Sequence, residues 1–315
     1  MDIQNVLKTT TEGQEKLVAI LQELDLPISR TATQISALHN ALNENERSRF
    51  LDWLSSVQHL KHHSARAKLL LPGSCKWLFE KQIFRNWARS SASSILWLHG
   101  IPGSGKSMLT CSFIEKIKAE YLQKKSGPLI AYFYCSRDTA ELERSDPDEI
   151  LRSVLEQLSS SHVDAPIREQ TLLAYRKKKQ DARGHKLQKL VLEESTEIIL
   201  QILEENPAII VIDALDECDP IRRLDLISAL RRIIQDSASV VKVFLSSRDD
   251  RDIVVRMDMS SEVYIKAEDN SKDIESYTMI QVERAIREGR ILNGEVSETL
   301  KMDIIGTLIS KANGM

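Results

Sequence analysis

The sequence predicts an α/β fold, a three-layer sandwich in which helices cover both faces of a mostly parallel sheet. Two observations lead to this prediction. Short apolar runs alternate with amphipathic stretches from residue 94 to residue 268, and strands that alternate with helices are typical of parallel sheets. The first of these runs leads into a glycine-rich loop that opens a helix. We expect a helical segment before this region and the start of another after it.

Five mostly apolar runs predict the strands, because each is short and contains few polar residues. They are 95–98, 129–135, 208–212, 240–245 and 262–265. Apolar residues at steps of three and four predict helices between and after the strands. These helices are 105–123, 147–160, 165–178, 187–205, 220–235, 271–289 and 297–312.

Two of the helices have clear start signals. Asp146 precedes Pro147, with Glu149 as a capping-box partner, and Asp219 precedes Pro220. An aspartate side chain accepts hydrogen bonds from the first N–H groups of a helix, and proline suits the first helical position because it has no N–H. The sequence therefore predicts helices that begin at Pro147 and Pro220.

Residues 1–70 are expected to be helical, and to pack on the next domain or on a partner rather than on a membrane surface. Three apolar faces support this: Leu17, Leu21 and Leu24; Ile35, Leu38 and Leu42; and Phe50, Trp53, Val57 and Leu60, with Pro27 between the first two helices. A break at 71–74 precedes a further helix over 75–90 that carries Trp77, Phe84 and Trp87. The expected domains are 1–70, 71–268 and 269–315, the last a truncated start of a helical segment that ends in a cap-like stretch over 311–315.

The composition excludes several classes of protein. A net charge of −3 over 315 residues gives no general attraction to nucleic acid or to anionic membranes. The short basic run 176–179 lacks aromatic neighbours and is expected to be a solvated helix end. No apolar run is long enough to span a bilayer, and residues 1–16 do not resemble a secretory signal. The four cysteines lack metal-ligand spacing, and Cys111 and Cys135 are expected in the core. A reducing compartment, the cytoplasm by default, is therefore expected.

The glycine-rich loop matches the phosphate-binding pattern G-x-x-x-x-G-K-[ST], from Gly100 to Gly105, Lys106 and Ser107. Glycines let the backbone approach a phosphate chain, successive N–H groups bind it, and the helix dipole adds positive potential. Lys106 would contact the β- and γ-phosphates, and Ser107 would bind Mg²⁺. The expected nucleotide-binding residues are Gly100, Ile101, Pro102, Gly103, Ser104, Gly105, Lys106, Ser107 and Met108.

The flanks of this loop distinguish it from a glycine-rich surface turn. An apolar run at 95–98 precedes it, and a helix face follows, formed by Met108, Leu109, Cys111, Ile114 and Ile117. A strand, a glycine loop and a helix in that order are what the motif requires. The sandwich is therefore expected to be of the P-loop NTPase type.

A second acidic stretch completes the predicted site. The apolar run 208–212 ends in Asp213, which we expect at the carboxyl edge of the sheet as a ligand of Mg²⁺. Asp216 or Glu217 could activate the attacking water, and the residues do not decide between them. The alternative is an acidic helix-capping loop, which the pairing with the phosphate loop disfavours.

An arginine follows the next expected strand. Arg248 lies after Ser246 and Ser247 and could contact the γ-phosphate and stabilise charge in the transition state. The alternative is a surface arginine paired with Asp249 or Asp250.

Together these residues resemble the NACHT class of STAND nucleotide switches, of the nephrocystin-like fungal type. The matching stretches are LWLHGIPGSGKSML, FYCSRD, IIVIDALDECDP, KVFLSSRDDRDI, NSKDIESY and KANGM, over about residues 62–315. The upstream stretch LDLPISR…FLDWLSSV resembles the helical segment that precedes the module in fungal members.

The resemblance implies binding of ATP or ADP with Mg²⁺ and slow ATP hydrolysis. ADP would hold a closed monomer, and exchange for ATP would allow oligomerisation and signalling, in fungal non-self recognition or programmed cell death. The family's roles fall on Gly100, Gly105, Lys106 and Ser107 for phosphates and metal, on Asp213 for the metal, on Asp216 or Glu217 for hydrolysis, and on Arg248 for γ-phosphate sensing.

The sequence departs from the family in two respects. The family usually has T-G-x-W-L where this chain has Ser74-Cys75-Lys76-Trp77-Leu78, and Cys75 in place of glycine would affect the adenine pocket if that loop lines it. The family's winged helix, sensor repeats and effector domain do not follow or precede these residues, so we expect a partial switch whose protein partners, or further copies, bind through the missing domains.

Two other functions remain as alternatives. A non-catalytic scaffold that holds nucleotide would share the whole site. A small-molecule or nucleotide kinase would need an arginine-rich lid, and the acidic loop at 213–217 fits it poorly. A GTPase base-reading motif and an ABC signature are both absent from the sequence.

Overall fold

The computed structural model describes residues 44–121, 127–160, 165–257 and 260–312. The chain divides into two compact units, residues 1–50 and 51–315, and the architecture below is that of the second unit. The expected helices within residues 1–43, with their leucine faces and Pro27, lie outside the described residues, as do residues 313–315. The expected domain boundaries at 70 and 268 stay predictions.

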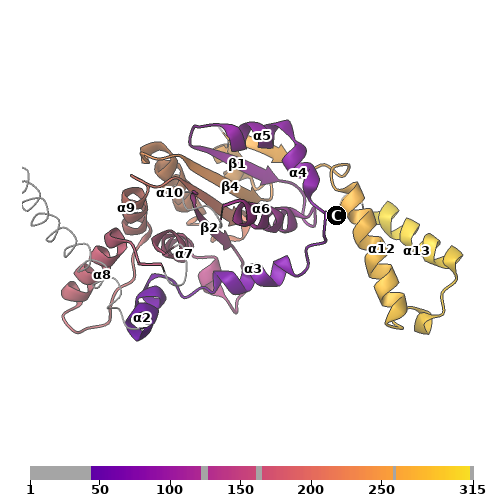
Figure 1. Ribbon diagram of the computed structural model, residues 1–315, viewed down its shortest axis with the longest axis horizontal. Coiled ribbons are helices and arrows are strands. Elements are labelled where there is room, and N and C mark those ends of the chain that lie inside the picture. Colours follow the sequence, from indigo (N-terminus) through magenta and orange to yellow (C-terminus); the bar gives the residue numbers. More distant parts are fainter. Residues whose placement is uncertain (1–43, 122–126, 161–164, 258–259, 313–315) are drawn as a thin grey trace, which may run out of the picture. The chain divides into compact units, whose positions relative to one another are not determined.

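A five-stranded parallel sheet forms the centre of the unit, in the order β2-β3-β4-β1-β5 (Figure 1). The sheet confirms the predicted α/β class, and each expected run forms a strand. The strands are β1 (Ser94–His99), β2 (Leu129–Tyr134), β3 (Ala208–Asp213), β4 (Val241–Ser247) and β5 (Ser261–Tyr264). Since every pairing is parallel, all five strands end at one edge, which we call the carboxyl edge.

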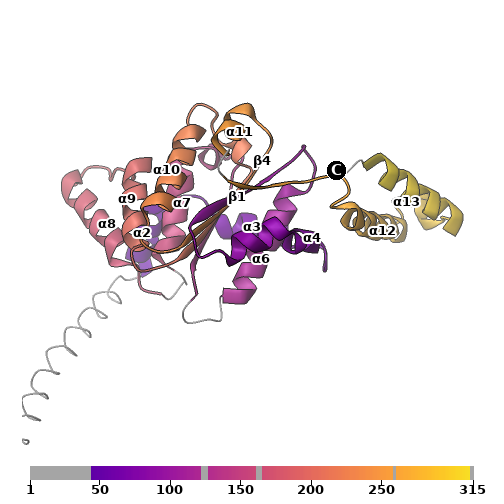
Figure 2. The same cartoon turned by 90° about the horizontal axis from the view of Figure 1, so that it is seen from above.

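Helices cover both faces of this sheet, with α10 on one side and α6 on the other (Figure 2). The helices are α2 (Glu44–Leu54), α3 (His59–Ala67), α4 (Lys76–Glu80), α5 (Gln82–Arg89), α6 (Lys106–Tyr121), α7 (Pro147–Ser159), α8 (Glu169–Ala182), α9 (Leu192–Ile202), α10 (Arg223–Asp236), α11 (Arg251–Met257), α12 (Ser271–Arg287) and α13 (Glu298–Ala312), with short 3-10 turns η1 (Leu142–Arg144), η2 (Leu215–Glu217) and η3 (Leu292–Gly294).

Alternate residues of the strands build the core on the α5 and α6 face, as the period of two along a strand requires. Phe113 of α6 stacks on Phe244 of β4 with ring centroids 4.7 Å apart, and Phe84 and Trp87 of α5 pack edge-on against Phe113. Cys111 and Cys135 are buried, as predicted, and Cys75 and Cys218 are buried too. Dispersion contacts of this kind hold the P-loop helix on the sheet.

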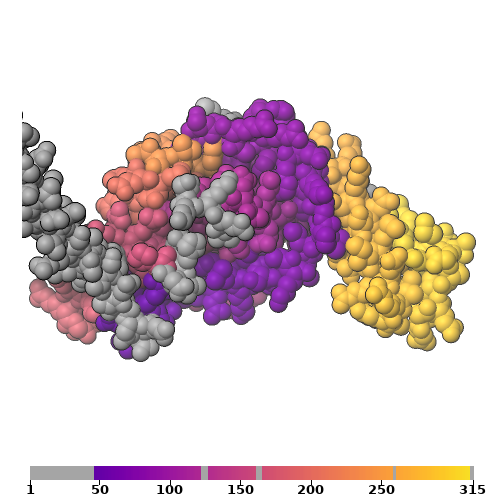
Figure 3. Space-filling view, viewed as in Figure 1, coloured from indigo at the N-terminus to yellow at the C-terminus, as the bar shows by residue number. Residues whose placement is uncertain are grey.

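Helix α3 packs against edge strand β2 and against α6. The ring of His63 joins the three elements, since its Nδ1 lies 2.8 Å from the Tyr134 hydroxyl and its Nε2 lies 2.7 Å from Glu115. Residues between 51 and 121, in indigo to purple, cover much of one face (Figure 3).

No helix among the described residues has both the length and the apolar content to cross a membrane.

The expected helical face from Phe50 to Leu60 is wrong, because the chain leaves the helix between α2 and α3. Glu149 of α7 accepts hydrogen bonds from the Ser55 hydroxyl at 2.8 Å and from the Ser56 N–H at 2.7 Å. These bonds hold residues 55–58 out of helical conformation. The expected single helix over 75–90 is likewise two helices, because Lys81 has the extended backbone angles φ −62° and ψ 133°.

The predicted helix start at Pro147 is confirmed, and the one at Pro220 is wrong. Asp146 caps α7 by accepting from Asp148 N–H at 3.2 Å, but Glu149 is turned to Ser55 and is no box partner. Asp219 accepts from the Ile221 N–H at 2.9 Å and forms a turn, so α10 begins at Arg223 rather than at Pro220.

Three further helices differ from the expected elements. Helix α8 covers Glu169–Ala182 rather than 165–178. Helix α9 begins at Leu192 instead of residue 187, because Arg152 and Trp53 side chains bind the carbonyls of Leu190 and Gln188. Helix α11 was not predicted from the sequence.

Candidate nucleotide-binding site

The P-loop lies at the carboxyl edge, between the end of β1 and the start of α6. An added Cβ at Gly100 would lie 3.2 Å from Ser104 Oγ and 3.3 Å from Ile265 Cβ, so close packing against the end of β5 disfavours a side chain there. Gly105 has φ +83°, which disfavours any side chain, and a Cβ there would meet no atom within 4 Å. The open side of the loop at Gly105 is therefore where a ligand could reach the backbone, and this fits a phosphate group.

The remaining P-loop positions differ in exposure. Ile101, Pro102 and Gly103 are exposed, Ser104 is buried, and Ser107 and Met108 at the start of α6 are half-buried. The Ser104 carbonyl accepts a hydrogen bond from Asn270 Nδ2 at 3.2 Å, just before α12. A residue far along the sequence thus helps to fix the loop.

The Lys106 amine folds back onto its own loop. Its Nζ donates to the carbonyls of Gly100 and Ile101, both at 2.8 Å. Burial lowers the pKa of Lys106, and the nearby carboxylates of Asp216 and Asp213 act against that shift. Since β1 leads into the P-loop and β3 ends at Asp213, Lys106 and the two acids lie at the same carboxyl edge of the sheet.

Asp213 ends β3 and is fully buried. Its Oδ1 accepts from the Ser246 hydroxyl of β4 at 2.5 Å, whereas its Oδ2 has no hydrogen-bond partner among the described residues. A buried carboxylate oxygen without a partner is costly unless something else satisfies it. Water bound to Mg²⁺ would do so, because that ion prefers oxygen ligands and keeps several waters. The residues present therefore fit the predicted metal.

The acidic turn follows Asp213 directly. Ala214 has φ 53° and ψ 49°, a left-handed conformation that costs a non-glycine residue about 1–2 kcal/mol. Its N–H donates to Ser246 Oγ at 2.9 Å, which holds the turn in place. The turn places Asp216 and Glu217 beside a cavity of about 300 Å³.

Asp216 and Glu217 differ in how their carboxylates are engaged. Both oxygens of Asp216 contact Arg248, one through the backbone N–H at 3.0 Å and one through Nε at 3.0 Å. Glu217 accepts from the backbone N–H of Arg137 at 3.3 Å.

Arg248 lies at the end of β4 with about half of its side chain exposed. The partners considered from the sequence, Asp249 and Asp250, are wrong: Asp249 binds the His99 ring at 2.6 Å and Asp250 binds Arg223 at 2.9 Å. Arg248 pairs with the acidic turn instead, so it is already part of the site.

Two residues of the site were missed in the sequence. Ser246 orients Asp213, and Arg137, after β2, contacts both acids of the turn. Tyr134 pairs with Asp213 in the sheet, so the loop after β2 must leave beside the acidic turn. The rule that parallel strands end at one edge could have drawn attention to both.

A family model described as nephrocystin 3, N-terminal, matches residues 73–248, more than half of the chain. The chain belongs to this family. The vegetative incompatibility protein HET-E-1 of Podospora anserina is 28% identical over 208 residues, which are 63% of this chain and 14% of that protein. These findings confirm the nephrocystin-like NACHT domain predicted from the motifs, and they support a nucleotide-binding domain of the P-loop NTPase type.

Among solved structures, a DNA replication initiation factor is similar at 11% identity and a TM-score of 0.39, over 78% of this chain and 59% of its own. The Aeropyrum pernix ORC1 protein in complex with DNA is similar at 14% identity and a TM-score of 0.41, over 82% and 68%. The match covers only a small part, 14%, of the length of HET-E-1.

Proposed function

We propose that this chain binds ATP and ADP with Mg²⁺, hydrolyses ATP slowly and acts as a conformational switch. One observation supports this above the others: the P-loop that carries Lys106 and the unpartnered, buried Oδ2 of Asp213 lie at the same edge of the sheet. A cation site opposite a phosphate loop is the arrangement that nucleoside triphosphate binding needs.

In this proposal Lys106 exchanges its two carbonyl partners for the β- and γ-phosphates. The backbone N–H groups of the loop and the start of α6 bind the same phosphates. Ser107 and Asp213 would hold Mg²⁺, which when bound neutralises part of the phosphate charge. Ser246 keeps Asp213 in position through its hydroxyl.

Glu217 is the proposed general base. Both acids border the cavity, but Asp216 is committed to Arg248 through both oxygens, whereas Glu217 makes one longer contact. Glu217 would take a proton from water as the water oxygen attacks the γ-phosphorus. The bond to the β-phosphate oxygen breaks, and ADP leaves with that electron pair. Arg248 would stabilise the charge on the transferred group.

The signalling role is proposed from the family and from the relative. HET-E-1 is named a vegetative incompatibility protein, and a comparable role in fungal non-self recognition or programmed cell death would use ADP-to-ATP exchange to control oligomerisation. Protein partners or further copies of the chain, in a reducing intracellular compartment, would receive the signal.

A non-catalytic scaffold is the second candidate, because Asp216 holds Arg248 at two points. In such a protein this pair would persist with nucleotide bound.

The test is to purify the chain, identify by mass spectrometry any nucleotide that it carries, and measure phosphate release from ATP on the same sample. Bound adenine nucleotide with slow, Mg²⁺-dependent release supports the switch. Bound nucleotide without release supports the scaffold. Failure to bind ATP or ADP in calorimetry, with Mg²⁺ present, contradicts both proposals.

A further inference from the structure

The loop from β2 to α7, residues 135–146, borders the proposed catalytic turn. It leaves β2 directly beside Asp213, and the Cys135 N–H donates to the Asp213 carbonyl at 3.0 Å. At its other end the Asp219 N–H donates to the Ser145 carbonyl at 2.9 Å. The loop thus contacts the polypeptide on both sides of the acidic turn.

Arg137 of this loop contacts the acidic turn twice. Its backbone N–H donates to Glu217 Oε2 at 3.3 Å, and its guanidinium Nη2 donates to the carbonyl of Asp216, the residue before. The first contact holds the carboxylate and the second holds the main chain from which that carboxylate extends. The direction of the Glu217 side chain therefore depends on Arg137.

The loop keeps its shape without the Arg137 side chain. The Ser136 N–H donates to the Arg144 carbonyl at 3.2 Å, and Arg144, buried, donates through Nε to the Tyr134 carbonyl at 3.0 Å. Arg144 also pairs with Glu141 at 2.5 Å. These contacts close the loop upon itself, so that substitutions at exposed Arg137 are expected to fold.

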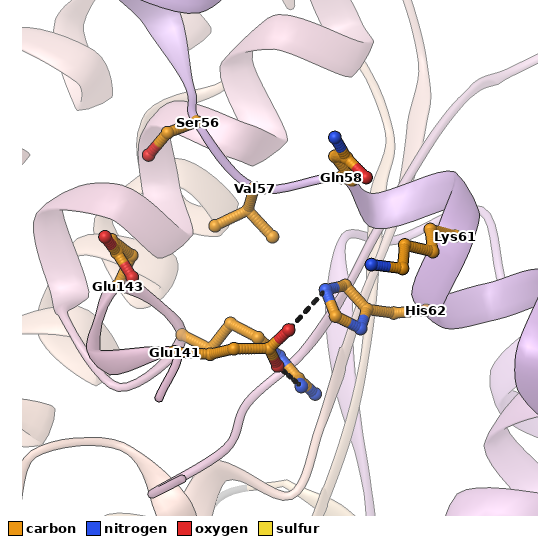
Figure 4. A pocket seen from close by; sticks show the side chains of 8 residues that line it. Ser56, Val57, Gln58, Lys61, His62, Glu141 and Glu143 are labelled. Atoms are coloured by element: carbon orange, nitrogen blue, oxygen red, sulfur yellow. Dashed lines mark hydrogen bonds and ion pairs between the residues drawn. The ribbon is translucent and has the colours of Figure 1, made fainter. Parts of the chain in front are cut away.

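The far side of the loop meets α3. Glu141 Oε1 lies 3.8 Å from His62 Nε2, both residues line a cavity of about 230 Å³, and Figure 4 shows the two side chains directed at one another. Glu141 thus contacts Arg144 on one side and His62 on the other. The loop is anchored away from the site, and Arg137 is its contact with the acidic turn.

We propose that Arg137 is a positioning residue for ATP hydrolysis, which rests on the proposed function above. By holding the Asp216 carbonyl, its guanidinium keeps Glu217 directed into the 300 Å³ cavity, which Arg137 and Arg248 also line. A charge-assisted hydrogen bond to main chain is strong enough to fix a catalytic carboxylate.

The experiment compares Arg137→Met, which keeps the length of the side chain without its donors, with Arg137→Lys. Calorimetry measures ATP and ADP affinity, and phosphate release measures kcat. We expect Arg137→Met to lower kcat about tenfold or more while Kd changes less than about twofold. Arg137→Lys should recover part of kcat, because the ammonium group can still donate. Arg287→Met, an exposed arginine of α12, is the control.

A double-mutant cycle with Glu217→Gln separates positioning from general destabilisation. If Arg137 acts through Glu217, then Arg137→Met should add little to the loss caused by Glu217→Gln. An unchanged kcat in Arg137→Met overturns the inference, and so does a full additional loss in the Glu217→Gln background or a parallel loss of nucleotide affinity. If the wild-type chain binds nucleotide but releases phosphate no faster than Lys106→Ala, the proposed hydrolysis is wrong. The positioning role of Arg137 is then wrong as well.

Discussion

Asp216 holds Arg248 at two points. Oδ1 accepts the backbone N–H of Arg248 at 3.0 Å, and Oδ2 lies 3.0 Å from its Nε. The carboxylate is almost completely buried while the guanidinium is about half exposed. To contact a γ-phosphate, Arg248 must exchange at least the side-chain part of this pair. The pair therefore sets how readily the arginine reaches the nucleotide.

The two acids of the turn should respond differently to neutral substitution. We expect Glu217→Gln to reduce phosphate release about 100-fold or more, as loss of a general base does, with ATP still bound. Asp216→Asn should reduce it less, because its task is to hold Arg248. Single-turnover phosphate release checks this, and the reverse order would assign the base to Asp216.

Arg248→Ala should separate ATP from ADP affinity. The arginine would contact only the third phosphate, so we expect ATP affinity to fall about tenfold, the value of one charge-assisted contact, and ADP affinity to stay unchanged. Calorimetry with both nucleotides measures this, and exposed Arg251→Ala is the control. Equal weakening of both nucleotides would contradict the sensor role.

Lys106→Ala should abolish nucleotide binding. The amine is the P-loop cation, and its hydrogen bonds to described residues go to the carbonyls of Gly100 and Ile101 and to the Ser104 hydroxyl. Lys116→Ala, exposed on the same helix, is the matched control and should bind normally. Unchanged ATP affinity in Lys106→Ala, measured by calorimetry, would rule out the site.

Asn270→Ala tests the contact between the P-loop and the residue before α12. The bond from Asn270 to the Ser104 carbonyl is buried, and its loss should lower the free energy of unfolding by about 1–3 kcal/mol. We also expect weaker nucleotide binding, since Ser104 lies within the loop. Denaturant unfolding and calorimetry measure both effects, with exposed Lys272→Ala as the control. No change in either quantity would show that this contact neither stabilises the protein nor supports nucleotide binding.

Glu156 should make stability depend on pH. Burial raises its pKa to about 8, and the charges of Glu149 and Asp52 add to this. Between its ordinary value of 4.5 and about 8, the folded chain keeps a proton that the unfolded chain has lost, so the contribution of Glu156 to stability falls as pH rises through this window. Glu156→Gln stays neutral, and its advantage over the native chain should grow from about pH 5 to about pH 8.

His59 must be separated from this effect. Its Nδ1 lies 3.7 Å from Glu156, and burial, with the charges of Lys118, His63 and His62, lowers its pKa to about 4. Its contribution is present above 6.5 and is lost as pH falls towards 4, the opposite direction. Urea unfolding across the pH range, with Glu120→Gln as an exposed control, distinguishes the two. A pH-independent difference for Glu156→Gln would contradict the assignment.

The strands and the P-loop could be predicted because their signals are local. A buried parallel strand must be almost wholly apolar, and the phosphate loop requires glycine and lysine at set positions. Asp213 was placed for the same reason, since it ends an apolar run.

The helix boundaries predicted from the sequence are wrong where side chains that are distant in the sequence bind the backbone. Glu149 ends the helix before Ser55, and Arg152 and Trp53 delay the start of α9. The partner of Arg248 also depended on the sheet order, because β4 lies between β1 and β3. Neither kind of contact leaves a periodic pattern in the sequence.

Cys75 stands where the family usually has glycine, and its backbone conformation explains that preference. It has φ 64°, where glycine is favoured, and its N–H donates to Asp273 at 2.8 Å. Its thiol is buried, and burial raises its pKa to about 11. The conformation, rather than the thiol, accounts for the glycine that the family usually has there.

The position of β4 in the sheet also fixes the distance between the ends of β1 and β3. One strand separates β1 from β3, and neighbouring strands lie about 4.8 Å apart, so the ends of β1 and β3 are spaced by roughly 10 Å. The backbone ladder maintains that span independently of any side chain at the edge. Substitutions of Asp213 or Lys106 would change the charged groups of the site but not the distance between the two strand ends. Only a rearrangement of the strands could change the size of molecule that fits between the loop and the acid.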